Sequence, residues 1–192
     1  EQVIASVFAE KTVYFAGDGQ AGKSSLAKHI YRSALARGIH PVYVKGETLT
    51  DVDPSAISKH ILKAYDEQYS HPHRDSFAQL PPERKAIIID DLPDSPLNRE
   101  AKARVLDWIR SKHDYVFVFG GDFSHVEELL ADMEQGQMVS AFPHYEIMEF
   151  GFLLRHKLIE KWLTLGAEHL ADRETLAHRV SEIERLVDTV LG

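Results

Sequence analysis

Residues Gly17 to Ser24 have the types and the spacing needed to hold phosphate groups. They read Gly-Asp-Gly-Gln-Ala-Gly-Lys-Ser and satisfy every fixed position of the pattern G-x-x-x-x-G-K-S/T. Glycines at positions 17, 19 and 22 allow positive φ angles and let backbone N–H groups approach phosphate oxygens closely. The sequence therefore predicts a phosphate-binding loop, and the alternative is a glycine-rich turn without a ligand.

The side chains of this loop have distinct expected roles toward ATP or ADP. Lys23 reaches the β- and γ-phosphates as a point charge and acts in catalysis, while the Ser24 hydroxyl ligates Mg²⁺. Ser25 is expected to donate a hydrogen bond to the α-phosphate. The complete predicted nucleotide-binding set is Gly17, Asp18, Gly19, Gln20, Ala21, Gly22, Lys23, Ser24 and Ser25.

A second candidate element is the apolar run 85–89, which ends in two carboxylates, Asp90 and Asp91. Because ligands of parallel sheets lie at the carboxyl ends of the strands, Asp90 is expected beside the loop, holding Mg²⁺ directly or through water. Asp91 points elsewhere and is the candidate that orients or deprotonates the attacking water. The alternative for Asp91 is a capping role in the following turn.

Several further residues have weaker predicted roles. Asp122 or Ser124, after the fourth apolar run, is a candidate γ-phosphate sensor or simply part of a glycine-containing turn. Arg155 is a candidate phosphate ligand or a surface arginine. The pair in His71-Pro-His73 is interpreted as part of a solvated loop because no carboxylate or cysteine set accompanies it.

The elements that must position these residues alternate between strand and helix patterns. The expected strands are residues 12–16, 41–45, 86–90, 115–119 and 145–150, and the expected helices are 23–37, 54–68, 97–112, 125–134, 152–165 and 173–190. This alternation predicts a three-layer α/β fold around a mainly parallel five-stranded sheet. Within the additional-strand class of P-loop NTPases the order is 2-3-4-1-5. Residues 69–82 are interpreted as a surface loop.

Composition limits the class of protein and its partners. The chain has 192 residues, a net charge of −8 and no cysteine. The acidic balance predicts no strong nucleic-acid signal, since a broad nucleic-acid surface needs a concentrated excess of Lys and Arg. No apolar stretch reaches the ~20 residues that span a bilayer, and no signal peptide is present, so no membrane insertion and a cytoplasmic location are expected.

The expected domains are a nucleotide-binding domain over residues 1–166 and a C-terminal helix over 167–192. Apolar residues in that helix form a two-heptad seam, which docks on the domain or begins a helical lid domain. These residues are Leu176, Val180, Ile183, Val187 and Val190. Because the chain begins without methionine and ends on a helical pattern, it is expected to be an excerpt of a longer polypeptide.

Taken together, three segments resemble the STAND class of P-loop NTPases, which contains the NACHT and NB-ARC ATPases. They are the phosphate loop followed by Ser-Leu-Ala, the run Ile-Ile-Ile-Asp-Asp, and residues 144–162. More narrowly, Pro96-Leu-Asn, Asp122-Phe123 and the run from Glu149 to Trp162 are similar to bacterial STAND modules attached to metallophosphoesterase domains.

The resemblance implies ATP binding with slow hydrolysis used as a conformational switch in a multidomain signalling or defence protein that often self-associates. Two departures matter. Gly120-Gly-Asp122 stands where many relatives carry an arginine after the fourth strand, and the downstream Gly-Leu-Pro and winged-helix parts are absent.

The primary hypothesis is thus an ATP-binding, Mg²⁺-dependent NTPase switch with further domains of the same polypeptide as partners. Two rivals share the loop. A small-molecule or nucleotide kinase needs an arginine-rich lid, which the sequence lacks. A nucleic-acid-associated ATPase or loader conflicts with the net charge.

Overall fold

The chain forms two compact units, Glu1–Ile147 and Met148–Gly192. The computed structural model describes residues 2–70, 74–121, 143–148, 151–165 and 173–191. No helix within these ranges is long and apolar enough to cross a membrane.

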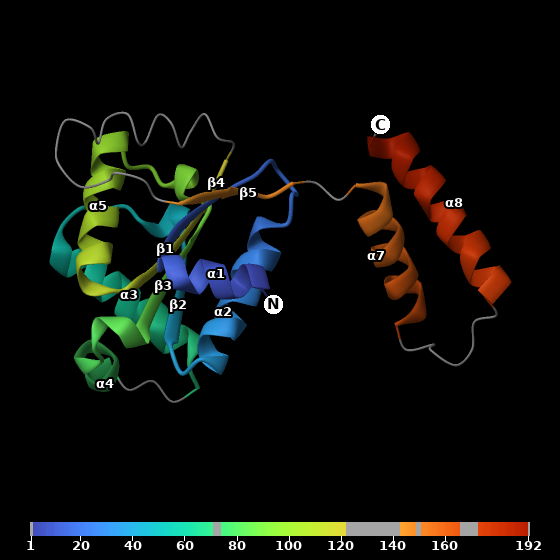
Figure 1. Cartoon of the computed structure of the whole chain (residues 1–192). Coiled ribbons are helices and arrows are strands. Elements are labelled where there is room, and N and C mark those ends of the chain that lie inside the picture. The colour runs from blue at the N-terminus through green and yellow to red at the C-terminus, as the bar shows by residue number, and fades with distance from the viewer. Residues whose placement is uncertain (1, 71–73, 122–142, 149–150, 166–172, 192) are drawn as a thin grey trace. The chain divides into compact units, whose positions relative to one another are not determined.

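A five-stranded parallel sheet forms the centre of the first unit (Figure 1). Its strands are β1 (Thr12–Ala16), β2 (His40–Lys45), β3 (Lys85–Asp90), β4 (Tyr115–Gly120) and β5 (His144–Glu146). The order is β2-β3-β4-β1-β5, and every neighbouring pair is parallel. The predicted fold class and strand order are confirmed. The carboxyl end of β1, where the phosphate loop starts, therefore lies between those of β4 and β5.

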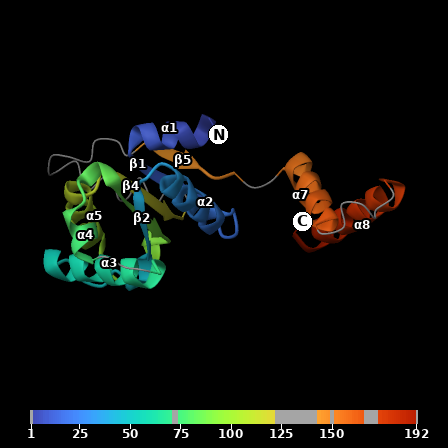
Figure 2. The ribbon, with the colours of Figure 1, turned by 90° about the horizontal axis from the view of Figure 1, so that it is seen from below.

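Helices cover both faces of the sheet (Figure 2). One face packs on α1 (Gln2–Glu10) and α2 (Lys23–Ala36), and the other on α3 (Pro54–Gln68), α4 (Arg74–Gln79) and α5 (Arg99–Lys112). Because successive side chains of a strand point to opposite faces, each central strand contributes side chains to the hydrophobic cores on both faces of the sheet. Val13 and Phe15 face α2, for example, while Tyr14 and Ala16 face α3 and α5.

Three short 3₁₀ turns connect these elements: η1 (Gly46–Thr48), η2 (Pro82–Arg84) and η3 (Leu92–Asp94). Side-chain caps fix where two helices begin. Asp53 accepts hydrogen bonds from the Ser55 and Ala56 amides ahead of α3, and Asn98 accepts one from Ala101 at the start of α5.

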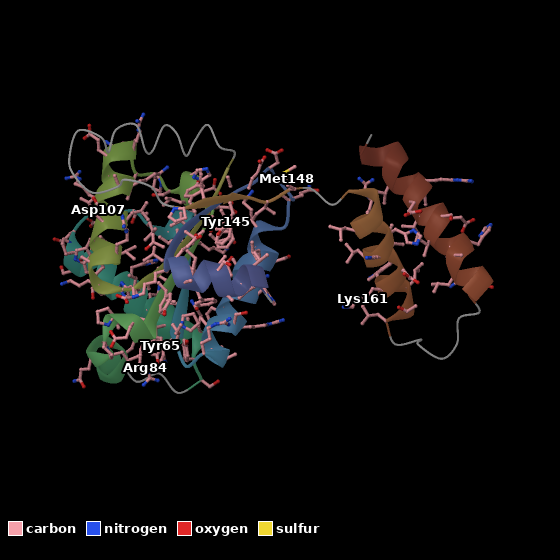
Figure 3. The ribbon with its side chains drawn as sticks, in the orientation of Figure 1. Tyr65, Arg84, Asp107, Tyr145, Met148 and Lys161 are labelled. Carbon is pink, nitrogen blue, oxygen red and sulfur yellow. The ribbon has the colours of Figure 1, made fainter. Side chains whose placement is uncertain are left out.

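Two helices of the first unit were not expected from the sequence. α1 precedes the first strand, and α4 lies inside the segment interpreted as a loop. Both are short, so their stability comes from tertiary packing rather than from helical periodicity. Phe8 of α1 is covered by Arg37, and Phe77 of α4 stacks on Tyr65, which Figure 3 labels. The helix expected at 125–134 lies outside the described residues.

His113, which follows α5, makes the fold sensitive to pH. Burial lowers its pKa from 6.5 to about 4, and its Nδ1 hydrogen-bonds the Ile109 carbonyl. Between these pKa values the unfolded chain binds a proton that the folded chain does not, so stability falls as the pH falls. We expect the free energy of unfolding to drop by about 2 kcal/mol between pH 7 and pH 5 from this group. Urea unfolding of the wild type and of His113→Asn measures it. An equal drop in both proteins would contradict the assignment.

The second unit is a helical pair, α7 (Phe152–Thr164) and α8 (Arg173–Leu191). Ile159 and Val180 are buried apolar residues among those that the structure describes in this unit, and His156 hydrogen-bonds Glu184 at 2.9 Å. Val180, one of the apolar residues expected to form the seam of the C-terminal helix, is thus buried in a two-helix unit. The expected boundary after residue 166 stays a prediction, whereas the two compact units divide at residue 147.

Candidate functional site

The predicted phosphate loop joins β1 to α2. Of its three glycines, only Gly22 has a positive φ, at 96°, and the other left-handed residue of the loop is Gln20. Gly22 is the N-cap of α2 and has no capping side chain. The Leu26 amide bonds the Gly22 carbonyl, so the amides of residues 23–25 have no carbonyl partner inside the helix. This N-terminus is suited to an anion.

Not every amide of the loop is available for such an anion. The Gly17 amide donates to the Gly121 carbonyl at 3.3 Å, and the Ala21 amide donates to Asp18 at 3.2 Å. These two bonds fix the path of the loop. The N–H groups that fit a phosphate therefore come mainly from the first turn of α2, and Gly17 acts as an anchor instead.

The Lys23 side chain folds back over the loop. Its Nζ atom donates to the carbonyls of Gly17 and Asp18, both at 2.9 Å, and lies 4.0 Å from Asp91 Oδ1. The side chain is 11% exposed. The carbonyl oxygens thus hold the ammonium group in the loop. Phosphate oxygens can take the place of these carbonyl oxygens as hydrogen-bond acceptors.

Asp90 lies at the end of β3 on the face that packs against α2, and it is only 7% exposed. Its Oδ2 atom accepts a hydrogen bond from the Tyr43 hydroxyl, while Oδ1 is buried and has no hydrogen-bond partner among the described residues. The Ser24 side chain also lies near Tyr43. The structure thus places Asp90 and Ser24 on either side of Tyr43, a residue that the sequence analysis missed.

Asp91 follows in a left-handed conformation, with φ 53° and ψ 58°. This turn separates the two carboxylates: Asp91 is 45% exposed at the side chain and lies near Lys23. Partial burial and the neighbouring Asp90 raise the pKa of Asp91, whereas Lys23 lowers it. The expectation that the two carboxylates point in different directions is consistent with this geometry.

Gly46, after β2, fits closely against the backbone of Asp91. A Cβ atom at this position would collide with the Asp91 carbonyl and lie 2.8 Å from the Leu92 Cα atom. Backbone cannot move aside as a flexible side chain can, so only glycine is compatible with this packing. The end of the edge strand β2 therefore supports the turn that carries Asp91.

The oxygens of Ser24 and Asp90 fit Mg²⁺. Hydroxyl and carboxylate oxygens are hard donors, and an unpartnered buried carboxylate oxygen such as Asp90 Oδ1 gains most from a cation. Among the described residues, no group of three or more histidine or acidic side chains is arranged to hold a metal ion by itself. A magnesium ion here would therefore take its other ligands from phosphate oxygens and water.

The remaining candidates are Ser25, Asp122, Ser124, Arg155 and the two histidines of the 71–73 segment. Ser25 is exposed on the first turn of α2. Asp122, Ser124 and the His71-Pro-His73 segment lie outside the described residues. Arg155 lies on α7 in the second unit.

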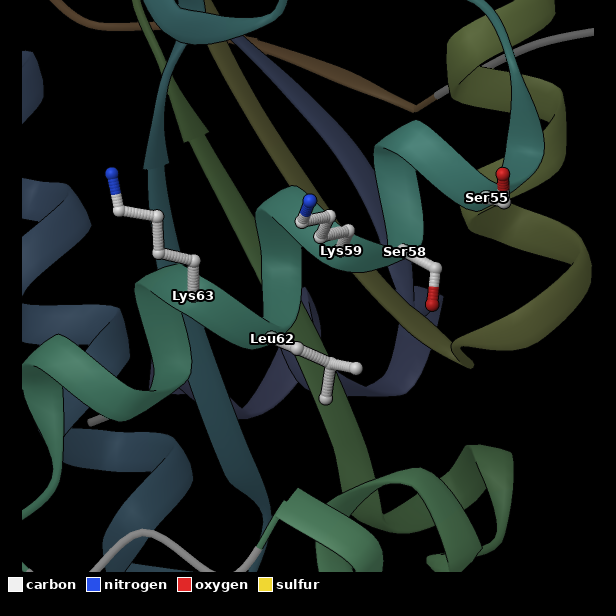
Figure 4. Close-up of a pocket in the computed structure, with 5 residues that line it drawn as sticks. All are labelled: Ser55, Ser58, Lys59, Leu62 and Lys63. Carbon is white, nitrogen blue, oxygen red and sulfur yellow. The ribbon is translucent and has the colours of Figure 1, made fainter.

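A surface depression elsewhere shows no link to these residues. It has a volume of about 440 Å³ and lies on α3, lined by Ser55, Ser58, Lys59, Leu62 and Lys63 (Figure 4). None of the predicted site residues lines it. The candidate site is therefore defined by the loop and the strand ends, not by this depression.

Comparisons with known proteins give a fold but no family. No family model and no curated protein matches the sequence. Among solved structures, AMPPCP-bound DnaA from Aquifex aeolicus is 13% identical with a TM-score of 0.50, covering 97% of this chain and 59% of that one. ORC1 from Aeropyrum pernix in complex with DNA is 15% identical with a TM-score of 0.54, covering 96% and 53%.

The replication initiator DnaA bound to AMPPCP and single-stranded DNA is 14% identical with a TM-score of 0.52, covering 98% of this chain and 59% of that one. The chain thus spans little more than half the length of these proteins. At these identities the likeness shows the fold alone.

One sequence-based expectation is wrong. The net charge predicted no strong nucleic-acid signal, yet two of the three similar structures were solved with DNA. Net charge is a sum over the whole surface, so it does not report a local basic region or what a given fold has been adapted to bind. Charge alone was therefore too coarse a criterion.

Proposed function

We propose that this chain is a Mg²⁺-dependent ATP-binding domain that hydrolyses ATP slowly and uses its bound nucleotide as a conformational switch. The observation that carries the proposal is the convergence of three groups at the carboxyl ends of β1 and β3. Lys23 contacts the loop carbonyls, Asp91 lies 4.0 Å from its ammonium, and the buried Asp90 is hydrogen-bonded by Tyr43, which lies near Ser24.

The role of each residue follows from its position in the site. Residues 17–25 would surround the phosphates, and Lys23 would exchange the loop carbonyls for β- and γ-phosphate oxygens. Ser24 and Asp90 would hold Mg²⁺, which neutralises charge on the phosphates when bound. Asp91 is partly exposed and close to Lys23, so it is placed to orient or deprotonate a water molecule.

The finer assignment rests on motifs. The resemblance of the loop, the Ile-Ile-Ile-Asp-Asp run and residues 144–162 to STAND ATPases supports a role in signalling or defence. A cytoplasmic location goes with this role. The confirmed strand order agrees with the same class.

A second candidate is a nucleic-acid-associated ATPase. The observation in its favour is the similarity of the fold to that of ORC1 in complex with DNA and of DnaA bound to single-stranded DNA. Both candidates use the same phosphate loop, so they differ in what stimulates turnover rather than in the site itself.

Nucleotide binding and turnover of the purified chain test these proposals. Fluorescent ATP and ADP are titrated in Mg²⁺ and in EDTA, and phosphate release is followed alone, with single-stranded DNA and with double-stranded DNA. Slow, DNA-independent release with tightly held ADP supports the switch. DNA-stimulated release supports the second candidate, and label transferred to an added acceptor would support a kinase. A chain that binds neither nucleotide contradicts all three.

A further inference from the structure

Tyr43 occupies a position between the two predicted magnesium ligands. It lies on β2, paired in register with Ile88 of β3, on the sheet face that packs against α2. Asp90 is the next residue of β3 on that face, because side chains alternate along a strand. The Tyr43 hydroxyl therefore reaches Asp90 from the neighbouring strand and donates to its Oδ2 atom.

The hydroxyl has a second neighbour, on α2. The Ser24 side chain lies beside it. The other oxygen of the carboxylate, Asp90 Oδ1, is buried and has no hydrogen-bond partner among the described residues. Tyr43 therefore occupies one Asp90 oxygen and leaves the other open next to Ser24.

This arrangement is what a hard cation requires of its ligands. A carboxylate ligand is oriented when its other oxygen accepts a hydrogen bond. Tyr43 meets this requirement at Asp90. Without the Tyr43 hydroxyl, Asp90 Oδ2 loses its donor and the carboxylate is no longer held in this orientation.

We propose that Tyr43 is a positioning residue that holds the Asp90 carboxylate beside Ser24 in the geometry that binds magnesium with the nucleotide. The inference rests on the proposed function of the site. Tyr43 itself is not a ligand. Its hydroxyl sets the direction of the Asp90 carboxylate.

The test compares Tyr43→Phe with wild type in Mg²⁺-dependent nucleotide binding, which needs no turnover. ATP affinity is measured over a series of Mg²⁺ concentrations and in EDTA. We expect the Mg²⁺ concentration at half-effect to rise about 10- to 100-fold in Tyr43→Phe, as for other residues that orient metal ligands. Affinity in EDTA should stay within about twofold, since loop contacts to phosphate are retained.

Tyr69→Phe is the matched control, because its hydroxyl donates to the Pro41 carbonyl at the opposite end of β2. It should keep the wild-type Mg²⁺ dependence. A variant with 4-aminophenylalanine at position 43 retains a donor to Asp90 and should restore part of the lost Mg²⁺ affinity, which a merely structural role of the ring would not explain. It also serves if Tyr43→Phe fails to fold in a thermal unfolding assay.

The outcomes separate this inference from the proposed function. A wild-type chain whose ATP affinity does not depend on Mg²⁺ contradicts both. A Mg²⁺-dependent wild type together with an unchanged Tyr43→Phe overturns only the role of Tyr43. Equal losses in Mg²⁺ and in EDTA would also overturn it, because they would indicate general damage to the loop.

Discussion

Lys23→Ala should remove detectable ATP binding, lowering the affinity by about a hundredfold or more. Hydrogen bonds to charged groups contribute about 1.5–3 kcal/mol each, and this ammonium is placed to contact two phosphate groups. The variant also removes the donor that now bonds the Gly17 and Asp18 carbonyls. Those two carbonyls would then face an incoming anion without a cation between them. Calorimetric titration with ATP in Mg²⁺ measures the loss.

Lys28→Ala is the matched control for this variant. Lys28 lies on the same helix, α2, and is exposed. Both variants lose one positive charge, so a long-range electrostatic effect would weaken binding equally in the two. Unchanged ATP affinity in Lys23→Ala, with folding verified by circular dichroism, would rule out the loop as the phosphate site.

Asp91→Asn should slow phosphate release by about a hundredfold or more while leaving ATP affinity nearly unchanged. A positioned general base contributes roughly 10²- to 10⁴-fold, and an amide cannot accept the proton. Asparagine keeps the size of the side chain and tolerates the left-handed backbone that Asp91 adopts, so the turn after β3 should survive. Single-turnover hydrolysis of bound ATP measures the chemical step.

Asp94→Asn removes the same charge from the end of η3 and is exposed, so it controls for loss of negative charge near the site. It should hydrolyse ATP at the wild-type rate. Wild-type hydrolysis by Asp91→Asn would exclude Asp91 from catalysis and leave it a structural role in the turn.

Much of the fold was predictable because strong local signals coincide with it. The run 86–90 is almost entirely apolar and corresponds to a fully buried strand, and Asp53-Pro54 marks the start of α3. α1 and α4 escaped prediction because each contributes only a few buried side chains, such as Val7 and Phe77, too few for a periodic pattern. An apolar residue type alone does not fix burial either: Leu158 and Trp162 are exposed on α7, at 51% and 66%, while Ile159 is buried.

The site was predictable only where its residues are adjacent in sequence. The loop and the two carboxylates form local motifs, whereas Tyr43 and Gly46 acquire their roles from the register between β2 and β3. An isolated tyrosine in a strand gives no signal of a neighbour that lies far along the chain. Sequence motifs therefore do not identify the site residues that come from a neighbouring strand.

The position of β1 between β4 and β5 has a consequence for synthesis of the protein. The loop precedes β4 and β5 in the chain, yet its Gly17 amide donates to the Gly121 carbonyl, and the preceding Ala16 carbonyl accepts from the Ile147 amide. Such distant pairings form late, because a long stretch of chain must be ordered first. The loop can therefore reach its folded conformation only after nearly the whole first unit has been synthesised. Bound nucleotide can stabilise the folded unit only after β5 has left the ribosome.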